Sequence, residues 1–381
     1  IKYIERRKEV MKKNMKKLYS LLLVLALTVS MAAGCGKTEK STTNSDTKKE
    51  EEVKKEEEKI PETTYPLTIK DQIGNEVTIK EQPKRIVSGY YISSSTCLAL
   101  GLKDKLVAVE EKIDQRPIYK YAAADIMDSV GNVGSAKAFD LEACLAAEPD
   151  LVILPKKAQD YAKTLTDMDI PTIVVSPESH DELVEMIKLI GEVTNSNDKA
   201  TAMTDKYDEI LDKINGMTKK LSDDKKPVVY MCGTNSYLTT APKDMYQASL
   251  IATAGGKNAG DVLDGDSWVD VSYEQILDMN PDYIIIPTNN MANGQPDYTA
   301  EDVMADANLA EVTAVKNGDV YNMPAGYEAW DSPVPSGVLG MLWMTATLHP
   351  DLYSMDEFAD DAADFYKTFY NFDIDKSSIT K

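Results

Sequence analysis

The chain has 381 residues, with 63 acidic and 42 basic side chains and a formal net charge of −21. Such an acidic protein is a poor partner for nucleic acid or for an anionic lipid surface. Its apolar content of 43% is enough for two medium-sized domains with ordinary hydrophobic cores.

The first part of the chain has the pattern of a lipoprotein signal peptide. Ile1 is not a methionine, and translation from Met11 or Met15 would place lysines before the apolar run at 21–27. A basic segment followed by an apolar segment too short to span a bilayer is typical of a signal peptide. The run leads to Ala-Ala-Gly before Cys35, which resembles a bacterial lipobox and implies lipid attachment at Cys35. The alternative is an ordinary secretory signal with a chance cysteine.

A strongly polar segment follows. From Lys37 to about Glu62 the chain is rich in Lys, Glu, Thr and Ser and has almost no apolar residue. It cannot bury a core, so we expect a disordered tether that holds the folded part at the outer face of the cytoplasmic membrane. A lipobox with a long tether favours a Gram-positive cell.

From residue 66 onward, strand patterns alternate with helix patterns, which predicts parallel sheets covered by helices on both faces. The long helix at the middle of the chain is expected to act as a stiff connection, so that any closing motion is small. In chain order, strands are predicted at 66–70, 76–79, 85–88, 106–109, 151–154, 172–175, 227–231 and 283–286, and helices at 93–100, 181–193 and 198–221.

One pattern occurs twice, with Glu142 and Glu274 at equivalent positions 132 residues apart (274 − 142). In each copy a capping residue, Asp140 or Ser272, opens a short helix, and Pro-Asp ends it before an apolar strand. Ser272 with Gln275 also fits a capping box. A period this long indicates two similar lobes, and the cleft between two lobes is a common place for a small ligand.

Five motifs in a fixed order resemble the iron-siderophore, cobalamin and haem class of ABC-transporter substrate-binding proteins. They are 67–87, the two repeated blocks at 142–153 and 274–285, Ala254–Asn258 and Ala314–Tyr321. The resemblance implies a class III periplasmic-binding-protein fold, with two α/β lobes of mainly parallel sheets joined by one backbone helix. It also implies a monomer that delivers a bulky metal complex or corrinoid to a permease and its ATPase.

The predicted organisation combines these observations. It consists of a signal peptide (1–34), a lipid-anchored disordered linker (35–64), an N-terminal lobe (65–195), a connecting helix (196–225) and a C-terminal lobe (226–381).

The resemblance also implies two docking residues. In that family a glutamate at the tip of each lobe contacts arginines of the permease, and by motif position these are Glu142 and Glu274. The alternative is that each glutamate only complements the dipole of its helix.

The ligand pocket is expected between the lobes, at the carboxyl ends of the strands. Flat aromatic rings there would give a bulky ligand a large rigid contact surface, although Tyr90 and Tyr91 could equally belong to the core. Trp268 resembles an aromatic residue that faces the cleft in cobalamin binders, but the equivalent residue in the first lobe, Ala136, is not aromatic. The predicted ligand-binding residues are Tyr90, Tyr91, Arg116, Tyr237, Trp268, Tyr327 and Trp330.

The identity of the ligand and of its metal stays open. Haem iron could be bound by Tyr90, Tyr91, Met231 or Met323. Arg85 and Arg116 are the only arginines after the signal peptide, which is few for an anionic siderophore, although lysines could serve. The segment from Trp330 is similar to a subgroup that includes binders of oxyanions such as molybdate and tungstate.

No motif of a hydrolase, a phosphate-binding loop or a zinc protease occurs in the chain, so we expect neither an enzyme nor a resident cofactor. A surface sensor or adhesin with the same fold is the alternative from another class.

Overall fold

The computed structural model describes residues 60–265, 267–287, 291–292 and 295–380. The predicted signal peptide, the predicted lipid attachment at Cys35 and the linker as far as residue 59 lie outside the described residues.

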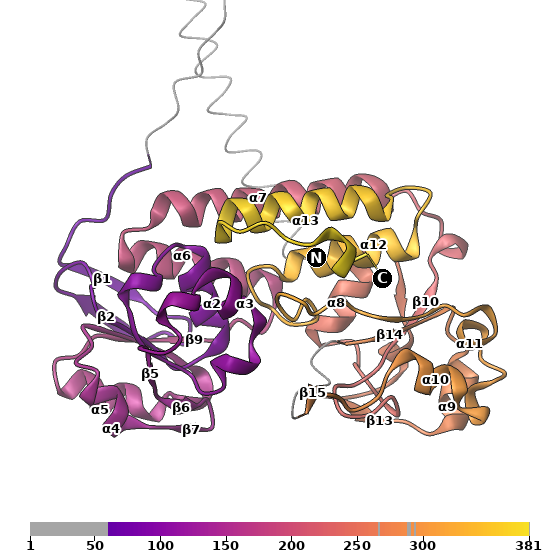
Figure 1. Ribbon diagram of the computed structural model, residues 1–381, viewed down its shortest axis with the longest axis horizontal. Coiled ribbons are helices and arrows are strands. Elements are labelled where there is room, and N and C mark those ends of the chain that lie inside the picture. The colour runs from indigo at the N-terminus through magenta and orange to yellow at the C-terminus, as the bar shows by residue number, and fades with distance from the viewer. Residues whose placement is uncertain (1–59, 266, 288–290, 293–294, 381) are drawn as a thin grey trace, which may run out of the picture. The chain divides into compact units, whose positions relative to one another are not determined.

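Two parallel sheets form the centre of the described part of the chain (Figure 1). Their inner strands are rich in Val, Ile and Leu and almost wholly buried, as expected when helices cover a parallel sheet on both faces. In spatial order, the first sheet consists of β5 (Gly131–Asn132), β4 (Leu106–Val109), β3 (Ile86–Ser88), β8 (Leu151–Pro155) and β9 (Thr172–Val175). The second consists of β12 (Lys257–Asn258), β10 (Val228–Met231), β14 (Tyr283–Ile286) and β17 (Val320–Asn322). The predicted α/β class is confirmed.

The two sheets share one strand order. Apart from β5, the strands of each sheet lie side by side in the order second, first, third, fourth, counted along the chain. The two orders are β4-β3-β8-β9 and β12-β10-β14-β17. In such a sheet the connections that leave the first and third strands go to opposite sides of the sheet, and a crevice opens outside the carboxyl ends of these two strands. That point lies between β3 and β8 in the first lobe and between β10 and β14 in the second.

Short antiparallel pairs accompany these sheets, and the first of them is the predicted hairpin. The pairs are β1 (Leu67–Lys70) with β2 (Glu76–Ile79), β6 (Gly134–Ser135) with β7 (Ala138–Phe139), β11 (Thr239–Thr240) with β13 (Val269–Asp270), and β15 (Met291–Ala292) with β16 (Gln295–Pro296).

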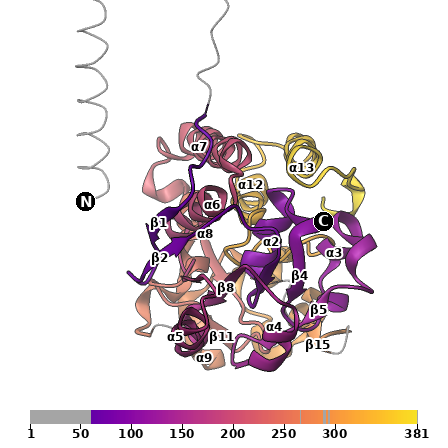
Figure 2. The ribbon, with the colours of Figure 1, turned by 90° about the vertical axis from the view of Figure 1, so that its left-hand side faces the viewer.

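The helices cover both sheets (Figures 1 and 2). They are α2 (Tyr91–Ala99), α3 (Pro117–Ala122), α4 (Leu141–Ala146), α5 (Asp160–Asp167), α6 (His180–Thr194), α7 (Asn197–Thr218), α8 (Tyr246–Thr253), α9 (Tyr273–Met279), α10 (Ala300–Ala305), α11 (Thr313–Asn317), α12 (Gly337–Leu348) and α13 (Met355–Tyr370). Within the described ranges, none of them is long and apolar enough to cross a bilayer.

The repeated pattern corresponds to α4 with β8 and α9 with β14. Asp140 Oδ1 accepts a hydrogen bond from Ala143 N at 2.9 Å and so caps α4. Ser272 Oγ accepts from Gln275 N at 3.2 Å, and Gln275 Oε1 accepts from Ser272 N at 2.8 Å. The predicted caps and capping box are therefore confirmed.

The aspartate that follows the proline has the same role in both copies of the repeated pattern. The Asp150 carboxylate accepts hydrogen bonds from the backbone N–H groups of Lys84 and Arg85, both at 2.8–2.9 Å. Asp282 Oδ2 accepts from Val228 N at 2.8 Å. Lys84 and Arg85 lead into β3, and Val228 opens β10. Each Pro-Asp pair thus fixes the start of the neighbouring central strand.

A long helix joins the two lobes. α6 ends at Thr194 and is capped by Asn195, which adopts a left-handed conformation (φ 56°), and α7 then runs along one side of the molecule (Figure 1). α7 packs against α6 in the first lobe and against α8 and α12 in the second. In Figure 2, α7, α12 and α13 all lie on the same side. The Tyr207 hydroxyl on α7 donates to Val334 O at 3.2 Å, which fastens the segment that leads into α12.

The main hydrophobic core runs through both lobes. It includes Ile153 of the first sheet, Ile285 of the second, Met203 of α7 and Trp343 of α12, all fully buried. Trp343 is therefore a packing residue, as its apolar helical surroundings predict. Two smaller cores lie on the outer faces of the two sheets.

Contacts with the folded body begin before residue 65. Thr63 N donates to Asn195 Oδ1 at 2.7 Å, and Thr63 Oγ1 donates to Glu192 O at 2.8 Å. Asn197 Nδ2 donates to Pro61 O at 3.3 Å. The last residues of the predicted linker thus lie against the junction of α6 and α7.

Removal of the Asp282 carboxylate tests the role of the Pro-Asp pair. We expect Asp282→Ala to lower the free energy of unfolding by about 1–3 kcal/mol, because the Val228 N–H loses its acceptor. Urea denaturation followed by circular dichroism measures this. Asp278→Ala, at an exposed position of the preceding helix α9, is the control and should change stability by about 0.5 kcal/mol or less. Equal effects of the two substitutions would contradict the role.

Candidate ligand-binding site

The carboxyl ends of all the strands of the first sheet converge on one cavity, of about 710 Å³. Its wall is made of residues that directly follow β3, β4, β8 and β9 and of the turn between β6 and β7, beyond β5. They include Gly89 to Tyr91, Glu110 to Lys112, Arg116, Ser135 to Lys137, Pro155 to Lys157, Gln159, Val175 and Glu178. This is the edge at which ligands bind to open parallel sheets.

A second cavity, of about 480 Å³, adjoins the first and shares Tyr91, Lys112 and Arg116 with it. Its wall combines the first-lobe segment 112–120 with residues of the segment 325–334, which follows the second sheet. The two cavities together form one cleft whose centre is Arg116.

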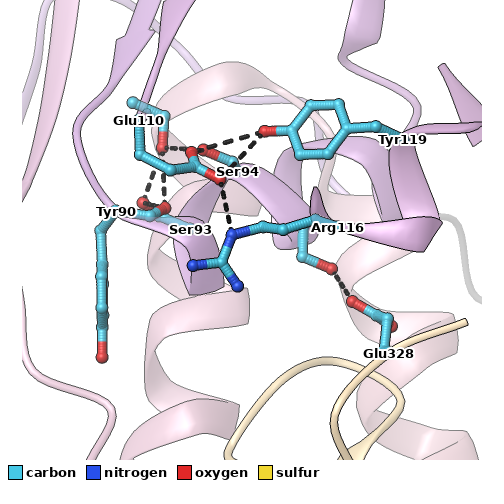
Figure 3. Close-up of polar contacts among 9 residues, drawn as sticks. Tyr90, Ser93, Ser94, Glu110, Arg116, Tyr119 and Glu328 are labelled. Carbon is cyan, nitrogen blue, oxygen red and sulfur yellow. Dashed lines mark hydrogen bonds and ion pairs between the residues drawn. The ribbon is translucent and has the colours of Figure 1, made fainter. Parts of the chain in front are cut away.

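Arg116 is held from two sides. Its guanidinium carbon lies 4.1 Å from the centre of the Tyr91 ring, a cation–π contact. Its Nε lies 3.6 Å from Glu110 Oε1. Figure 3 shows the two terminal guanidinium nitrogens directed away from Glu110, so the part of Arg116 that can form a bidentate contact with an anion stays free of this ion pair.

The partner of Arg116 is a buried carboxylate. Glu110 has 5% of its surface exposed and accepts hydrogen bonds from Ser94 Oγ and from the Tyr119 hydroxyl (Figure 3). Burial raises the pKa of Glu110, and the Ser94 hydrogen bond and the Arg116 charge oppose that rise. The network gives Arg116 a fixed position at the base of the cleft.

A second buried carboxylate, that of Glu328, lies on the wall of the smaller cavity. Glu328 accepts hydrogen bonds from Ser95 Oγ of α2, from Ser336 Oγ at 2.5 Å and from the Tyr370 hydroxyl of α13 at 2.8 Å. Burial raises the pKa of Glu328, and these hydrogen bonds lower it. Glu328 and Ser95 both line the smaller cavity, so a hydrogen bond between segments far apart in sequence forms part of its wall.

Four of the predicted ligand-binding residues lie on the walls of this cleft: Tyr90, Tyr91, Arg116 and Tyr327. Tyr90 and Tyr91 are half-buried and contact each other edge to face, with ring centres 5.2 Å apart. Tyr327 is 3% exposed and so presents only an edge to the cavity.

The other three predicted residues do not line these two cavities. Trp330 is 1% exposed, and its Nε1 donates to the Tyr366 hydroxyl at 3.0 Å. The Tyr237 hydroxyl donates to Asp306 Oδ2 at 2.9 Å. Trp268 is half-buried and lies against Gly233, just beyond the end of β10. Their roles in ligand binding stay predictions.

Several polar residues of the cleft are not among the residues predicted from the sequence. Glu110 and Glu328 are the buried members of this set, and the lysines at its rim are Lys112, Lys137, Lys156 and Lys157. Lys112, Lys156 and Lys157 follow predicted strands within a few residues, so a systematic search of strand ends would have found them. Nothing else in the sequence indicates a role in ligand binding for an exposed lysine.

The two predicted docking glutamates are exposed. Glu142 lies in the first turn of α4 and Glu274 in the first turn of α9, and both helices lie along the lower edge of the molecule in Figure 1, opposite α7. The pKa of Glu274 is lowered by backbone and Ser272 hydrogen bonds, so this side chain carries its charge at neutral pH.

Comparison with known proteins agrees with this arrangement. The chain is 27% identical to the uncharacterized ABC transporter substrate-binding lipoprotein YvrC of Bacillus subtilis over 345 residues, which span 89% of this chain and 99% of YvrC. It is 26% identical to the petrobactin-binding protein YclQ of the same organism over 317 residues, or 80% of this chain and 90% of YclQ. The structure of the molybdate-binding protein MolA of Haemophilus influenzae, bound to molybdate, superposes with a TM-score of 0.70 at 22% identity and covers 81% of this chain and 99% of MolA.

The two-lobe fold, with a polar and aromatic cleft at the strand ends, is that of a class III periplasmic solute-binding protein. A model of the family described as periplasmic binding protein matches residues 86–327, more than half of the chain. The chain belongs to this family and is the substrate-binding protein of an ABC importer.

Proposed function

We propose that this protein is a lipid-anchored receptor on the outer face of the cytoplasmic membrane that captures a bulky metal complex and delivers it to an ABC permease. The cargo is an iron complex of a siderophore or haem, or a corrinoid. The observation that carries the proposal is the convergence of strand ends, Arg116 and four tyrosines (Tyr90, Tyr91, Tyr119 and Tyr327) on one cleft. Its two parts, of about 480 and 710 Å³, suit a ligand of several hundred daltons rather than a single small ion.

An oxyanion such as molybdate or tungstate is the second candidate. MolA, a molybdate-binding protein, has the same fold, but at 22% identity this likeness concerns the fold alone and not the ligand. A tetrahedral oxyanion would fill only a small part of the cleft. The name of YclQ, by contrast, specifies a siderophore as its ligand.

Neither catalysis nor a purely structural surface role is part of this proposal. The relatives named above are binding proteins of transporters. A sensor or adhesin would not need an exposed glutamate at equivalent positions of both lobes, whereas docking to a permease would use the pair formed by Glu142 and Glu274.

Ligand capture is tested by thermal unfolding of the full-length protein in nonionic detergent. We expect one of haem, cyanocobalamin, ferric siderophores of different classes, molybdate or tungstate to raise the melting temperature. At a concentration about a hundredfold above Kd, a ligand adds roughly 2.7 kcal/mol of stability. Arg116→Met should abolish most of the shift, because the central cation of the cleft is lost.

The control for that substitution is Arg85→Met. Arg85 donates to the carbonyl groups of Ala147 and Glu148 at the end of α4 and does not line the cleft. The ligand-induced shift of this variant should equal that of the unmodified protein. A shift that survives Arg116→Met, or that no ligand of the panel produces, would count against the proposed capture site.

Docking is tested by the double substitution Glu142→Ala with Glu274→Ala. We expect unchanged ligand affinity and loss of cellular uptake, because both anionic contacts with the permease are removed while the cleft stays intact. The matched control, Glu185→Ala with Glu209→Ala, removes two exposed glutamates from α6 and α7 and should leave uptake unchanged. Normal uptake in the first double variant would refute the docking assignment.

The lipid anchor is tested by Cys35→Ala. Without the thiol that accepts the lipid, we expect the protein to leave the membrane fraction and to enter the culture medium of a Gram-positive host. Immunoblots of fractionated cells measure this, and metabolic labelling with a radioactive fatty acid should mark only the unmodified chain. Equal membrane retention and labelling of both proteins would rule out lipid attachment at this residue.

A further inference from the structure

The rim of the larger cavity concentrates positive charge on an acidic protein. The described residues that line it include five cationic side chains, Arg116 with Lys112, Lys137, Lys156 and Lys157, against three acidic ones, Glu110, Glu111 and Glu178. Over the whole chain, acidic residues outnumber basic ones by 63 to 42. The balance of charge is therefore reversed at this cavity.

The ion pairs of the lysines also bear on this cavity. Of the twenty other lysines in the described ranges, ten form ion pairs, such as Lys103 with Asp125 at 2.7 Å and Lys367 with Asp373 at 2.9 Å, and ten, Lys219 and Lys220 among them, form none. In the described part of the chain, no carboxylate forms an ion pair with the four cavity lysines. Arg116 pairs with Glu110 through Nε alone, so the four lysines add unpaired positive charge to that of its terminal nitrogens.

The strand order places these lysines where a ligand binds. Lys156 and Lys157 directly follow β8, and Tyr90 and Tyr91 directly follow the adjacent strand β3. β3 and β8 flank the crevice of the first sheet. Lys112 follows β4, and Lys137 lies in the turn between β6 and β7. The cations thus surround the cavity from separate loops rather than along one helix face.

This arrangement has a defined physical effect. Exposed lysines stay hydrated, so their mutual repulsion is weak in the empty protein. A ligand with several negative charges would interact with all of them at once and would lose little hydration on that side, whereas an uncharged ligand would gain nothing from them.

We propose that the cargo carries several negative charges, as an iron(III) complex with catecholate or carboxylate arms does, and that Lys112, Lys137, Lys156 and Lys157 select it against uncharged complexes of similar size. The charged side of the complex faces these lysines and Arg116, and its remaining surface lies against Tyr91 and the smaller cavity. This inference rests on the proposed function and narrows it, because electrically neutral iron(III) trihydroxamates and cyanocobalamin are then poor ligands.

The test compares two iron complexes of similar size and different charge. An iron(III) trihydroxamate is electrically neutral, whereas an iron(III) triscatecholate carries several negative charges. Using the full-length protein, fluorescence quenching should give a Kd at least about tenfold lower for the triscatecholate. Lys156→Gln with Lys157→Gln should weaken triscatecholate binding by roughly tenfold and leave trihydroxamate binding within about twofold.

The chain offers a matched control for this variant. Lys219 and Lys220 are also adjacent and exposed, they lie at the end of α7, and they do not line the cleft. Lys219→Gln with Lys220→Gln changes the net charge equally and should leave both dissociation constants unchanged. An equal loss in both double variants would mean that only the overall charge matters, and the inference would be wrong.

Further outcomes separate this inference from the proposed function. Tighter binding of the trihydroxamate or of cyanocobalamin than of the triscatecholate would overturn the charge selection and leave the receptor function intact. Binding of molybdate alone, weakened by Lys156→Gln with Lys157→Gln, would support recognition of an anion and contradict a bulky metal complex. Failure of every probe to bind would contradict both proposals.

Discussion

The parallel direction of the strands is the constraint on which the rest of this molecule depends. A parallel sheet covered by helices on both faces has no free face, so ligand contacts are confined to its edges. All carboxyl ends lie at one edge, and the order β4-β3-β8-β9 opens a crevice in its middle. Aromatic, acidic and basic side chains from distant parts of the sequence therefore meet in one cleft without any loop having to cross the sheet.

Within that cleft, hydrogen bonds from hydroxyl groups offset the free-energy cost of burying two carboxylates. Two carboxylates, Glu110 and Glu328, lie on the walls with almost no exposure, a position that costs free energy unless hydrogen bonds satisfy the carboxylate oxygens. Ser94 and Tyr119 serve the first, and Ser95, Ser336 and Tyr370 serve the second. These networks fix the positions of α2, α3 and α13 around the cleft, which gives a ligand a largely preformed surface.

The sequence predicted the local secondary structure well. The caps at Asp140 and Ser272, the breaks at the prolines and the buried strands depend on neighbours in sequence, so the pattern alone was sufficient. The positions of aromatic residues depend on tertiary packing, and the sequence could not distinguish Tyr91 on the cavity wall from Trp330 in the core. The lysines of the rim were missed because their only signal in the sequence is a place after predicted strands, which Lys137 lacks, and only the strand order brings Lys137 and Lys156 to one place.

The continuous core has a consequence for the independence of the two halves. Although the repeated pattern indicates two similar halves, the main core is not divided between them: Ile153, Ile285, Met203 and Trp343 belong to one buried cluster. Each half on its own would expose the apolar surface that it now shares with α7 and α12. We therefore expect a chain divided at α7 to yield two fragments that need each other to fold.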